Sequence, residues 1–273
     1  VLADAGWTIV DSAAEAELVL VNTCGFIKPA KEEAIQVSLQ AVSGSPQARA
    51  VMTGCLAQRY GEEIAPDMEE LTGFFGNRSP QDILEFVEKR VPAGERVWRP
   101  WSSSGAVMDN KNVQKVDRDL PAYRVPARSQ LLGFGASAYV KVAEGCRNRC
   151  TFCAIPLIRG DLRSRARADV VSEVKDLLAR GVKEIILIAQ DLNAFGMDRP
   201  GGTSELRPLL EEILRIPGDH WIRPLYVYPD TFDLGILDLF SDPRLLPYFD
   251  IPFQHGSRRV LKAMARVGDA ASY

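Results

Sequence analysis

Three cysteines lie within eight residues of this sequence, at Cys146, Cys150 and Cys153 in the stretch EGCRNRCTFCAIP. The chain has only five cysteines in 273 residues, and a C-x3-C-x2-C spacing would arise by chance with an expectation of about 0.002. Soft thiolates grouped in this way suit an iron–sulfur cluster, and three of them on a 4Fe–4S cube leave one iron open to a small molecule. We therefore predict a cluster site in this loop.

The same cysteines have three other interpretations: a zinc site, a catalytic thiol, or buried core residues. Structural zinc is usually held by four ligands, and only two other cysteines and two histidines are present to complete such a set. A catalytic cysteine does not need two neighbours. Core cysteines are not expected on a loop that also carries Arg147, Arg149 and Thr151. The cluster is favoured, and metal analysis would separate it from zinc.

The cysteine loop is more basic than the chain as a whole. Residues 141–167 carry seven Lys and Arg side chains against Glu144 and Asp161, whereas the whole chain has a net charge of −3. A cluster held by three thiolates is anionic, and so is a ligand with a carboxylate group. The basic surroundings support such a site, and a solvated basic loop is the alternative.

The composition is that of an ordinary globular protein, with 46% hydrophobic and 25% charged residues. Its charge balance gives no sign of nucleic-acid or membrane binding. Apolar runs fall far short of the ~20 residues that span a bilayer, and no signal peptide is visible, so we predict no membrane partner. An odd number of cysteines argues against a disulfide framework and favours a cytoplasmic setting. Because the chain starts at Val1 rather than Met, we expect a fragment.

The elements that would position these residues begin with an α/β pattern over residues 1–92. Strands are expected at 17–23, 49–54 and 71–77, and helices from Pro29 and over 81–90. In the first helix, Ile35, Leu39 and Val42 recur at helical spacing and should form the buried face. Strands that alternate with helices predict a parallel sheet. Residues 93–136 break this rhythm with prolines and polar runs, and we interpret them as a connector.

The β-then-α rhythm resumes in residues 137–273. Strands are expected at 138–143, 184–190, 222–229 and 248–254, and helices over 170–178, 206–214, 234–240 and from Ser257. Polar residues follow each strand: the cysteine loop, Gln190 with Asp191, Tyr228 to Asp230, and Gln254 with His255. Four successive β-α units predict a partial barrel, whose site is built from the carboxyl ends of its strands.

Six stretches together resemble the radical S-adenosylmethionine (SAM) superfamily and, within it, the methylthiotransferases of the RimO branch. They are VNTCGFI (21–27), VMTGCLAQRY (51–60), YVKVAEGCRNRCTFCAIPLIRGDLRSR (139–165), LIAQDLNAFG (187–196), YVYPD (226–230) and DIPFQHGS (250–257). They span nearly the whole chain in the family's order. The MiaB branch, which modifies tRNA, is less similar. The resemblance implies an N-terminal methylthiotransferase α/β domain in 1–92 and a truncated radical SAM barrel in 137–273.

The resemblance also implies two cofactors and a division of labour between cysteines. Cys146, Cys150 and Cys153 would hold a 4Fe–4S cluster whose open iron binds SAM, and electron transfer into SAM would release a 5′-deoxyadenosyl radical. Cys24 and Cys55 would ligate an auxiliary 4Fe–4S cluster. Taken alone, those two cysteines would more often be core residues. The family uses a third cysteine near its N-terminus, and its barrel continues into a TRAM domain. Both would lie outside this chain, so the fragment could be inactive alone.

The implied reaction adds a methylthio group to the β-carbon of an aspartate of ribosomal protein S12. An electron donor such as flavodoxin or ferredoxin would be a second partner. Two alternatives stay open: a tRNA methylthiotransferase of the MiaB type, and a zinc-binding structural or RNA-binding module. SAM contacts are expected from Gln190, Asp191, Arg165 for the carboxylate, and the backbone of Phe152, although a structural role is equally compatible with each.

Overall fold

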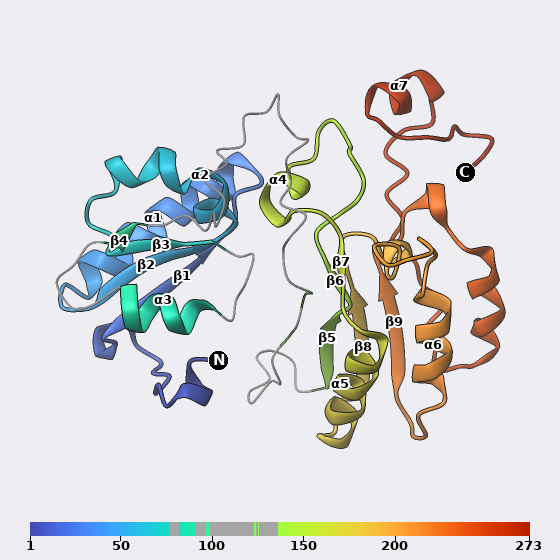
Figure 1. Ribbon diagram of the computed structural model, residues 1–273, viewed down its shortest axis with the longest axis horizontal. Helices are drawn as coiled ribbons and strands as arrows, with labels where there is room; N and C mark the ends of the chain where they lie inside the picture. Colours follow the sequence, from blue (N-terminus) through green and yellow to red (C-terminus); the bar gives the residue numbers. More distant parts are fainter. Residues whose placement is uncertain (77–81, 91–96, 99–122, 124, 126–135) are drawn as a thin grey trace. The chain divides into compact units, whose positions relative to one another are not determined.

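The computed structural model describes residues 1–76, 82–90, 97–98, 123, 125 and 136–273 (Figure 1). The chain divides into two compact units. One contains residues 1–115 with 157–159, and the other contains residues 116–156 with 160–273. Most of the expected connector, residues 93–136, lies outside the described residues. Each unit is therefore described by itself.

The first unit is a parallel α/β sheet with strands in the order β1-β2-β3-β4. Its strands are β1 (Leu18–Thr23), β2 (Arg49–Gly54), β3 (Gly73–Phe75) and β4 (Val97–Trp98). Its helices are α1 (Lys28–Gly44), α2 (Cys55–Ile64) and α3 (Ile83–Arg90), with short 3-10 turns η1 (Ala3–Ala5), η2 (Ala13–Glu15) and η3 (Ala65–Asp67). The pairings that can be followed are parallel, as the alternating pattern predicts.

Two hydrophobic clusters cover the two faces of this sheet. Met52 and Phe74 pack with residues of α1 and α2 on one face. Val51 and Phe75 pack with Phe86 of α3 on the other. Figure 1 shows α2 and α3 on opposite sides of the sheet. Successive strand residues alternate between the two clusters because side chains of a strand point to opposite faces. A parallel sheet buried on both faces is the expected outcome of such hydrophobic strands.

The predicted buried face of α1 is wrong in one position. Leu39 is 38% exposed, and the fully buried positions of the helix are Ala34 and Ser38. Small residues allow the helix to lie close to the sheet, and the Ser38 hydroxyl donates a hydrogen bond of 2.8 Å to the Ala34 carbonyl. Ile35 and Val42 still pack at the edge of the cluster, as their spacing predicts.

The second unit is built on three parallel strands in the order β5-β8-β9. These are β5 (Ser137–Lys141), β8 (Glu184–Ile188) and β9 (Trp221–Leu225), and a separate antiparallel pair is formed by β6 (Ala143–Glu144) and β7 (Arg163–Ser164). The helices are α5 (Arg167–Ala179), α6 (Leu206–Leu214) and α7 (Arg258–Ala263), with 3-10 turns η5 (Leu192–Ala194), η6 (Pro229–Thr231) and η7 (Leu234–Ser241). The short helix α4 (Ile155–Arg159) contains residues that are assigned to both units. Each strand pairs with the next one in sequence, which is the order of a barrel wall.

One large core joins this sheet to its helices. It includes Val140, Leu187 and Ile222 from the strands, with Leu177 of α5 and Leu209 of α6, all at most 1% exposed. The buried residues of α5 and α6 recur at helical spacing, as in amphipathic helices that pack on a sheet. In the described part of the chain, no helix is both long and apolar enough to cross a bilayer.

Two predicted elements of this unit differ from the structure. Residues 234–240 form the 3-10 helix η7 rather than an α-helix. Residues 248–254 are not a strand, although Val227 N, two residues after the end of β9, donates a hydrogen bond to Asp250 O at 2.9 Å. The segment contains Pro252 and follows Pro247, and neither proline has an amide proton to donate to a regular ladder.

Candidate iron–sulfur and cofactor site

The cysteine loop begins at the carboxyl edge of the β5-β8-β9 sheet. Val142 N donates to Ile188 O at 3.0 Å, which fixes the chain just before the loop to the end of β8. The β6–β7 pair then closes the base of the loop, with Ala143 opposite Ser164. This is the edge at which the parallel sheet predicts a site.

Tight backbone packing shapes the start of the loop. Gly145 has φ +74°, and a Cβ at this position would lie 2.1 Å from the Asp161 carbonyl oxygen. The next amide, Cys146 N, donates to Gly160 O at 3.2 Å. Only glycine has both the conformational freedom and the small size that this crossing of two chain segments requires.

The three thiols of the loop share one partly desolvated environment. Cys146 is buried, and Cys150 and Cys153 are partly buried. Burial raises the pKa of Cys146 to about 11, with a smaller contribution from Asp191 and the other two thiols. Burial also raises the pKa of Cys153, and Cys150 adds to the effect. The surroundings of Cys146 and Cys153 therefore favour neutral thiols unless a cation compensates their negative charge, and metal binding would supply that cation and release protons.

The donor set fits a cluster better than a single ion. Among the described residues, no three His, Cys, Asp or Glu side chains are close enough to hold one metal ion. A 4Fe–4S cube does not require its ligands to converge on one point, since each thiolate binds its own iron atom. Three thiols of one loop that interact electrostatically and carry no disulfide match that demand.

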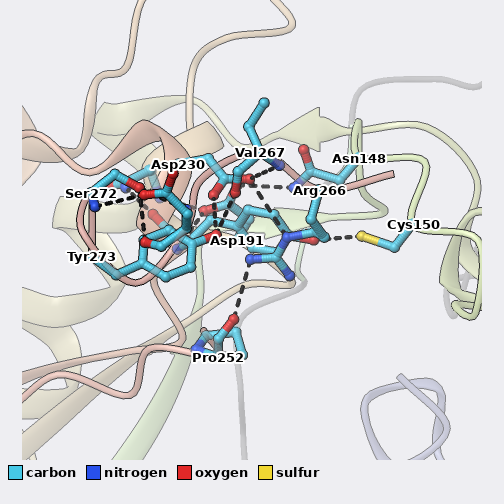
Figure 2. Close-up of polar contacts among 12 residues, drawn as sticks. Asn148, Cys150, Asp191, Asp230, Pro252, Arg266, Val267, Ser272 and Tyr273 are labelled. Atoms are coloured by element: carbon cyan, nitrogen blue, oxygen red, sulfur yellow. Dashed lines mark hydrogen bonds and ion pairs between the residues drawn. The ribbon is translucent and has the colours of Figure 1, made fainter. Parts of the chain in front are cut away.

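Asp191 fixes the cysteine loop to the strand ends (Figure 2). One carboxylate oxygen accepts a hydrogen bond from the Asn148 side chain at 3.2 Å, between two of the cysteines. The other accepts from the backbone amides of Asn193 at 3.1 Å and Tyr228 at 3.4 Å. Burial raises the pKa of Asp191, and these hydrogen bonds oppose the rise. Asp191 thus connects the loop with the segments that follow β8 and β9.

Replacing Asp191 by alanine should weaken the hold of the loop on its metal. The change leaves the Asn148 amide and two backbone amides without their acceptor, and each buried unsatisfied group costs about 1–3 kcal/mol. We expect iron to be lost about 10- to 100-fold more readily to a chelator, as for other residues that orient metal ligands. Chelator-competition kinetics on the reconstituted protein measure this. Iron release at the rate of the unsubstituted protein would contradict the role.

The C-terminal segment packs directly on the cysteine loop. The Thr151 amide donates to Met264 O at 3.2 Å, and its hydroxyl donates to Ala263 O at 3.1 Å. Residues 151 and 263 are 112 positions apart in sequence. The end of α7 and the residue after it are therefore hydrogen-bonded to the cysteine loop at Thr151.

Arg165, expected to bind the carboxylate of SAM, is 3% exposed and engaged within the unit. Its guanidinium lies 2.5 Å from Glu173 of α5 and also donates to Lys141 O at 2.8 Å. These contacts tie the end of β7 to α5 and β5. A contact of Arg165 with SAM stays a prediction, and the contacts observed are structural.

The Arg165–Glu173 pair should contribute strongly to stability. Glu173→Gln leaves a buried guanidinium without its counter-ion, which costs about 3 kcal/mol or more in comparable pairs. Glu211→Gln is the matched control, since its pair with Arg207 is exposed and should leave the unfolding free energy unchanged. Urea denaturation measures both. Equal unfolding midpoints for the two variants would show that the buried pair does not stabilise the fold.

The basic character of the loop is largely accounted for by ion pairs inside the unit. Lys141 pairs with Glu144, Arg149 with Asp161, and Arg167 with Glu212. The Arg163 guanidinium lies 5.7 Å from the centre of the Tyr123 ring. Much of the positive charge is therefore neutralised by carboxylates of the same unit, and only part of it is available to an anionic ligand.

The remaining predicted residues lie around the same edge in different settings. Phe152 belongs to the cysteine loop, but it is 49% exposed, so its side chain is not packed inside the loop. Gln190 is half-buried directly after β8. His255 is exposed, and its Nδ1 accepts a hydrogen bond from Ser257 N at 2.9 Å, which is the ordinary role expected of a single histidine there.

Cys24 and Cys55 lie side by side at the carboxyl edge of the first unit's sheet. The residues before them, Thr23 and Gly54, are partners in the β1–β2 register. A Cβ at Gly25 would lie 2.7 Å from the Cys55 carbonyl oxygen, which shows how closely the two turns approach. Cys24 is exposed and Cys55 partly exposed. The structure thus presents both thiols at one sheet edge, as their spacing after two strands predicts.

Sequence reasoning missed Asn148 and Arg266. Asn148 lies inside the cysteine motif but is not part of its C-x3-C-x2-C pattern, so only its contact with Asp191 reveals it. Arg266 is 5% exposed and contacts Tyr228 and Asp230, which lie more than 30 positions earlier. Neither has a local sequence signal, because each acts through a partner that only the fold brings near.

Two family models match the chain in agreement with this architecture. Residues 1–76 match the Uncharacterized protein family UPF0004, and residues 140–273 match the Radical SAM superfamily. A radical SAM methyltransferase, TsrM from Kitasatospora setae, has a TM-score of 0.60 and 18% identity over 95% of this chain and 55% of that chain. The radical enzyme OxsB has a TM-score of 0.58 and 15% identity over 93% of this chain and 37% of its own. The fold and the three-cysteine loop define a radical SAM protein, and the predicted fold class is confirmed.

Comparison with curated relatives identifies the branch of the radical SAM superfamily. Ribosomal protein uS12 methylthiotransferase RimO of Treponema denticola is 37% identical over 100% of this chain, and that of Desulfotalea psychrophila is 42% identical over 97%. The chain belongs to the RimO branch of the radical SAM methylthiotransferase family, which confirms the resemblance seen in the motifs. It spans 58% and 57% of the length of these two relatives.

Proposed function

We propose that this chain carries the two cysteine sites of a radical SAM methylthiotransferase that places a methylthio group on the β-carbon of an aspartate of ribosomal protein S12. The observation that carries the proposal is the placement of all five cysteines. Three share a loop at the carboxyl edge of one parallel sheet, and two follow register-paired strands of another. Identity of 37–42% to proteins named for this reaction supports the substrate.

Each residue then has a defined task. Cys146, Cys150 and Cys153 would hold the SAM-binding 4Fe–4S cluster, and Cys24 and Cys55 the auxiliary one. When bound, SAM and the first cluster would supply one-electron reductive cleavage, and hence a radical able to remove hydrogen from an unactivated carbon. The electron would come from a small donor such as flavodoxin or ferredoxin. We place the reaction in the cytoplasm, where ribosomal proteins and free thiols occur together.

The remaining side chains orient and enclose the bound groups. Gln190 and the backbone at Phe152 lie at the loop edge and would contact SAM. Asp191 and Arg165 are buried and occupied by protein partners, so we propose that they hold the loop and the strand ends in place. The segment at Met264 is hydrogen-bonded to the loop at Thr151 and would help to hold the loop in place.

Anaerobic reconstitution of the full-length protein with iron and sulfide tests the proposal. The expected result is cleavage of SAM to 5′-deoxyadenosine together with a mass gain on ribosomal protein S12. Mass spectrometry of tRNA and S12 from a deletion strain distinguishes a MiaB-type activity, in which only tRNA loses its methylthio group. Zinc without iron or labile sulfide would instead support a structural module. Absence of both SAM cleavage and substrate modification would refute the enzymatic proposal.

A further inference from the structure

Tyr228 is fixed rigidly beside the cysteine loop. Its side chain is 6% exposed, and its hydroxyl lies within hydrogen-bonding distance of the Cys150 sulfur. Its backbone is held on both sides, since its amide donates to Asp191 at 3.4 Å and its carbonyl accepts from the Asn193 side chain at 3.2 Å. The hydroxyl therefore has little freedom to turn away from the sulfur.

A buried arginine stacks on the Tyr228 ring. The guanidinium carbon of Arg266 lies 3.5 Å from the ring centre, and the residue is 5% exposed. Arg266 is held by an ion pair of 3.5 Å with Asp230 and by a hydrogen bond of 3.2 Å to Pro252 O. The Tyr273 hydroxyl donates to the other oxygen of Asp230 at 3.0 Å (Figure 2). A continuous chain of contacts thus links the C-terminal segment to Cys150.

The direction of the Cys150 contact follows from the chemistry of a metal ligand. A cysteine that ligates iron is a thiolate and has no proton to give, so the tyrosine must be the donor. Hydrogen bonds to cluster sulfurs are among the factors that set cluster reduction potentials. A cation over the ring withdraws electron density from the phenol and makes its O–H a better donor.

We propose that Tyr228, supported by Arg266, is a positioning residue that donates a hydrogen bond to the Cys150 thiolate and raises the reduction potential of the cluster held there. The inference rests on the proposed function. The hydrogen bond stabilises the reduced cluster more than the oxidised one, because the reduced cluster carries one more negative charge. Its removal should make the cluster harder to reduce.

Tyr226 offers a matched control on the same strand end. It lies two residues earlier, is 39% exposed and has φ +68°, so it is a tyrosine close in sequence but more open to solvent. Between the described residues, no hydrogen bond joins the Tyr226 hydroxyl to a cysteine. Tyr226→Phe removes the same single oxygen atom without touching the Cys150 contact.

The experiment measures the midpoint potential of one cluster by electron paramagnetic resonance at poised potentials. A background with Cys24→Ser and Cys55→Ser leaves only the loop cluster. Tyr228→Phe should shift the midpoint to more negative values, Arg266→Gln should shift it the same way by a smaller amount, and Tyr226→Phe should shift it less than Tyr228→Phe does. If Tyr228→Phe fails to retain its cluster, the shift in Arg266→Gln decides the matter.

Two failures are distinguishable. If the background protein forms no 4Fe–4S signal, the proposed function itself is wrong. If it forms the signal but Tyr228→Phe and Arg266→Gln have its midpoint, or if Tyr226→Phe shifts as far as Tyr228→Phe, only the role of Tyr228 is overturned.

Discussion

Replacing Cys150 by serine in the reconstituted full-length protein is expected to lower SAM cleavage by more than about 100-fold, because loss of a metal ligand should exceed the 10- to 100-fold cost of losing its supporting partners. A serine hydroxyl is a poor ligand for the soft iron–sulfur core. The protein should still fold, since Cys150 is only partly buried. Quantification of 5′-deoxyadenosine and of iron per chain measures the effect.

Cys24→Ser is the informative comparison for this prediction. Cys24 lies in the other unit and is exposed, so its loss should leave SAM cleavage intact while the methylthiolated product disappears. If Cys150→Ser cleaves SAM as fast as the unsubstituted protein, the loop is not the cluster site. If Cys24→Ser abolishes cleavage as completely as Cys150→Ser, the two sites do not have separate tasks.

Replacing Gly145 by alanine is expected to destabilise the protein by about 3–5 kcal/mol, a size seen only where a specific structural conflict exists. The new Cβ would lie 2.1 Å from the Asp161 carbonyl oxygen and 2.7 Å from that of Gly160. Both are backbone atoms and cannot move aside as a flexible side chain can. The clash adds to the cost of holding alanine at φ +74°. Urea unfolding of the apo-protein measures the change.

Gly181→Ala separates the clash from the backbone conformation. Gly181 also has a positive φ, +90°, but a Cβ there would meet no atom within 4 Å. Only the conformational cost of about 1–2 kcal/mol should remain. Equal losses of stability in the two variants would show that the crossing beneath the cysteine loop is not as tight as the structure indicates.

The sequence predicted most elements because their signals are local. The strand at 49–54 and the helix at 206–214 are found at the predicted bounds, since a run of apolar residues or a helical spacing needs no distant partner to be recognised. The strand predicted at 248–254 is absent. Apolar and polar residues alternate there as in a strand, but nearby prolines prevent a regular hydrogen-bond ladder. The exposed Leu39 shows that spacing alone does not select which of two overlapping helix faces meets the sheet.

The sequence predicts the site as a set of candidate ligands, but it does not predict how they are arranged. The spacing of Cys146, Cys150 and Cys153 identifies the loop from residue types alone. What holds the loop is not visible in the sequence, because Asp191 contacts it directly and Arg266 acts through Tyr228, from segments that fold next to it only in three dimensions. Contacts over such separations carry no periodic or local signal.

The hydrogen bonds between the C-terminal segment and the cysteine loop have a consequence for biosynthesis. Thr151 finds its partner 112 residues later in the chain. At about 5–20 residues per second, the ribosome needs roughly 6–22 s to add that length. During this interval the loop has been synthesised without its contacts to α7. The loop therefore reaches its final set of contacts only after this much later segment has been added.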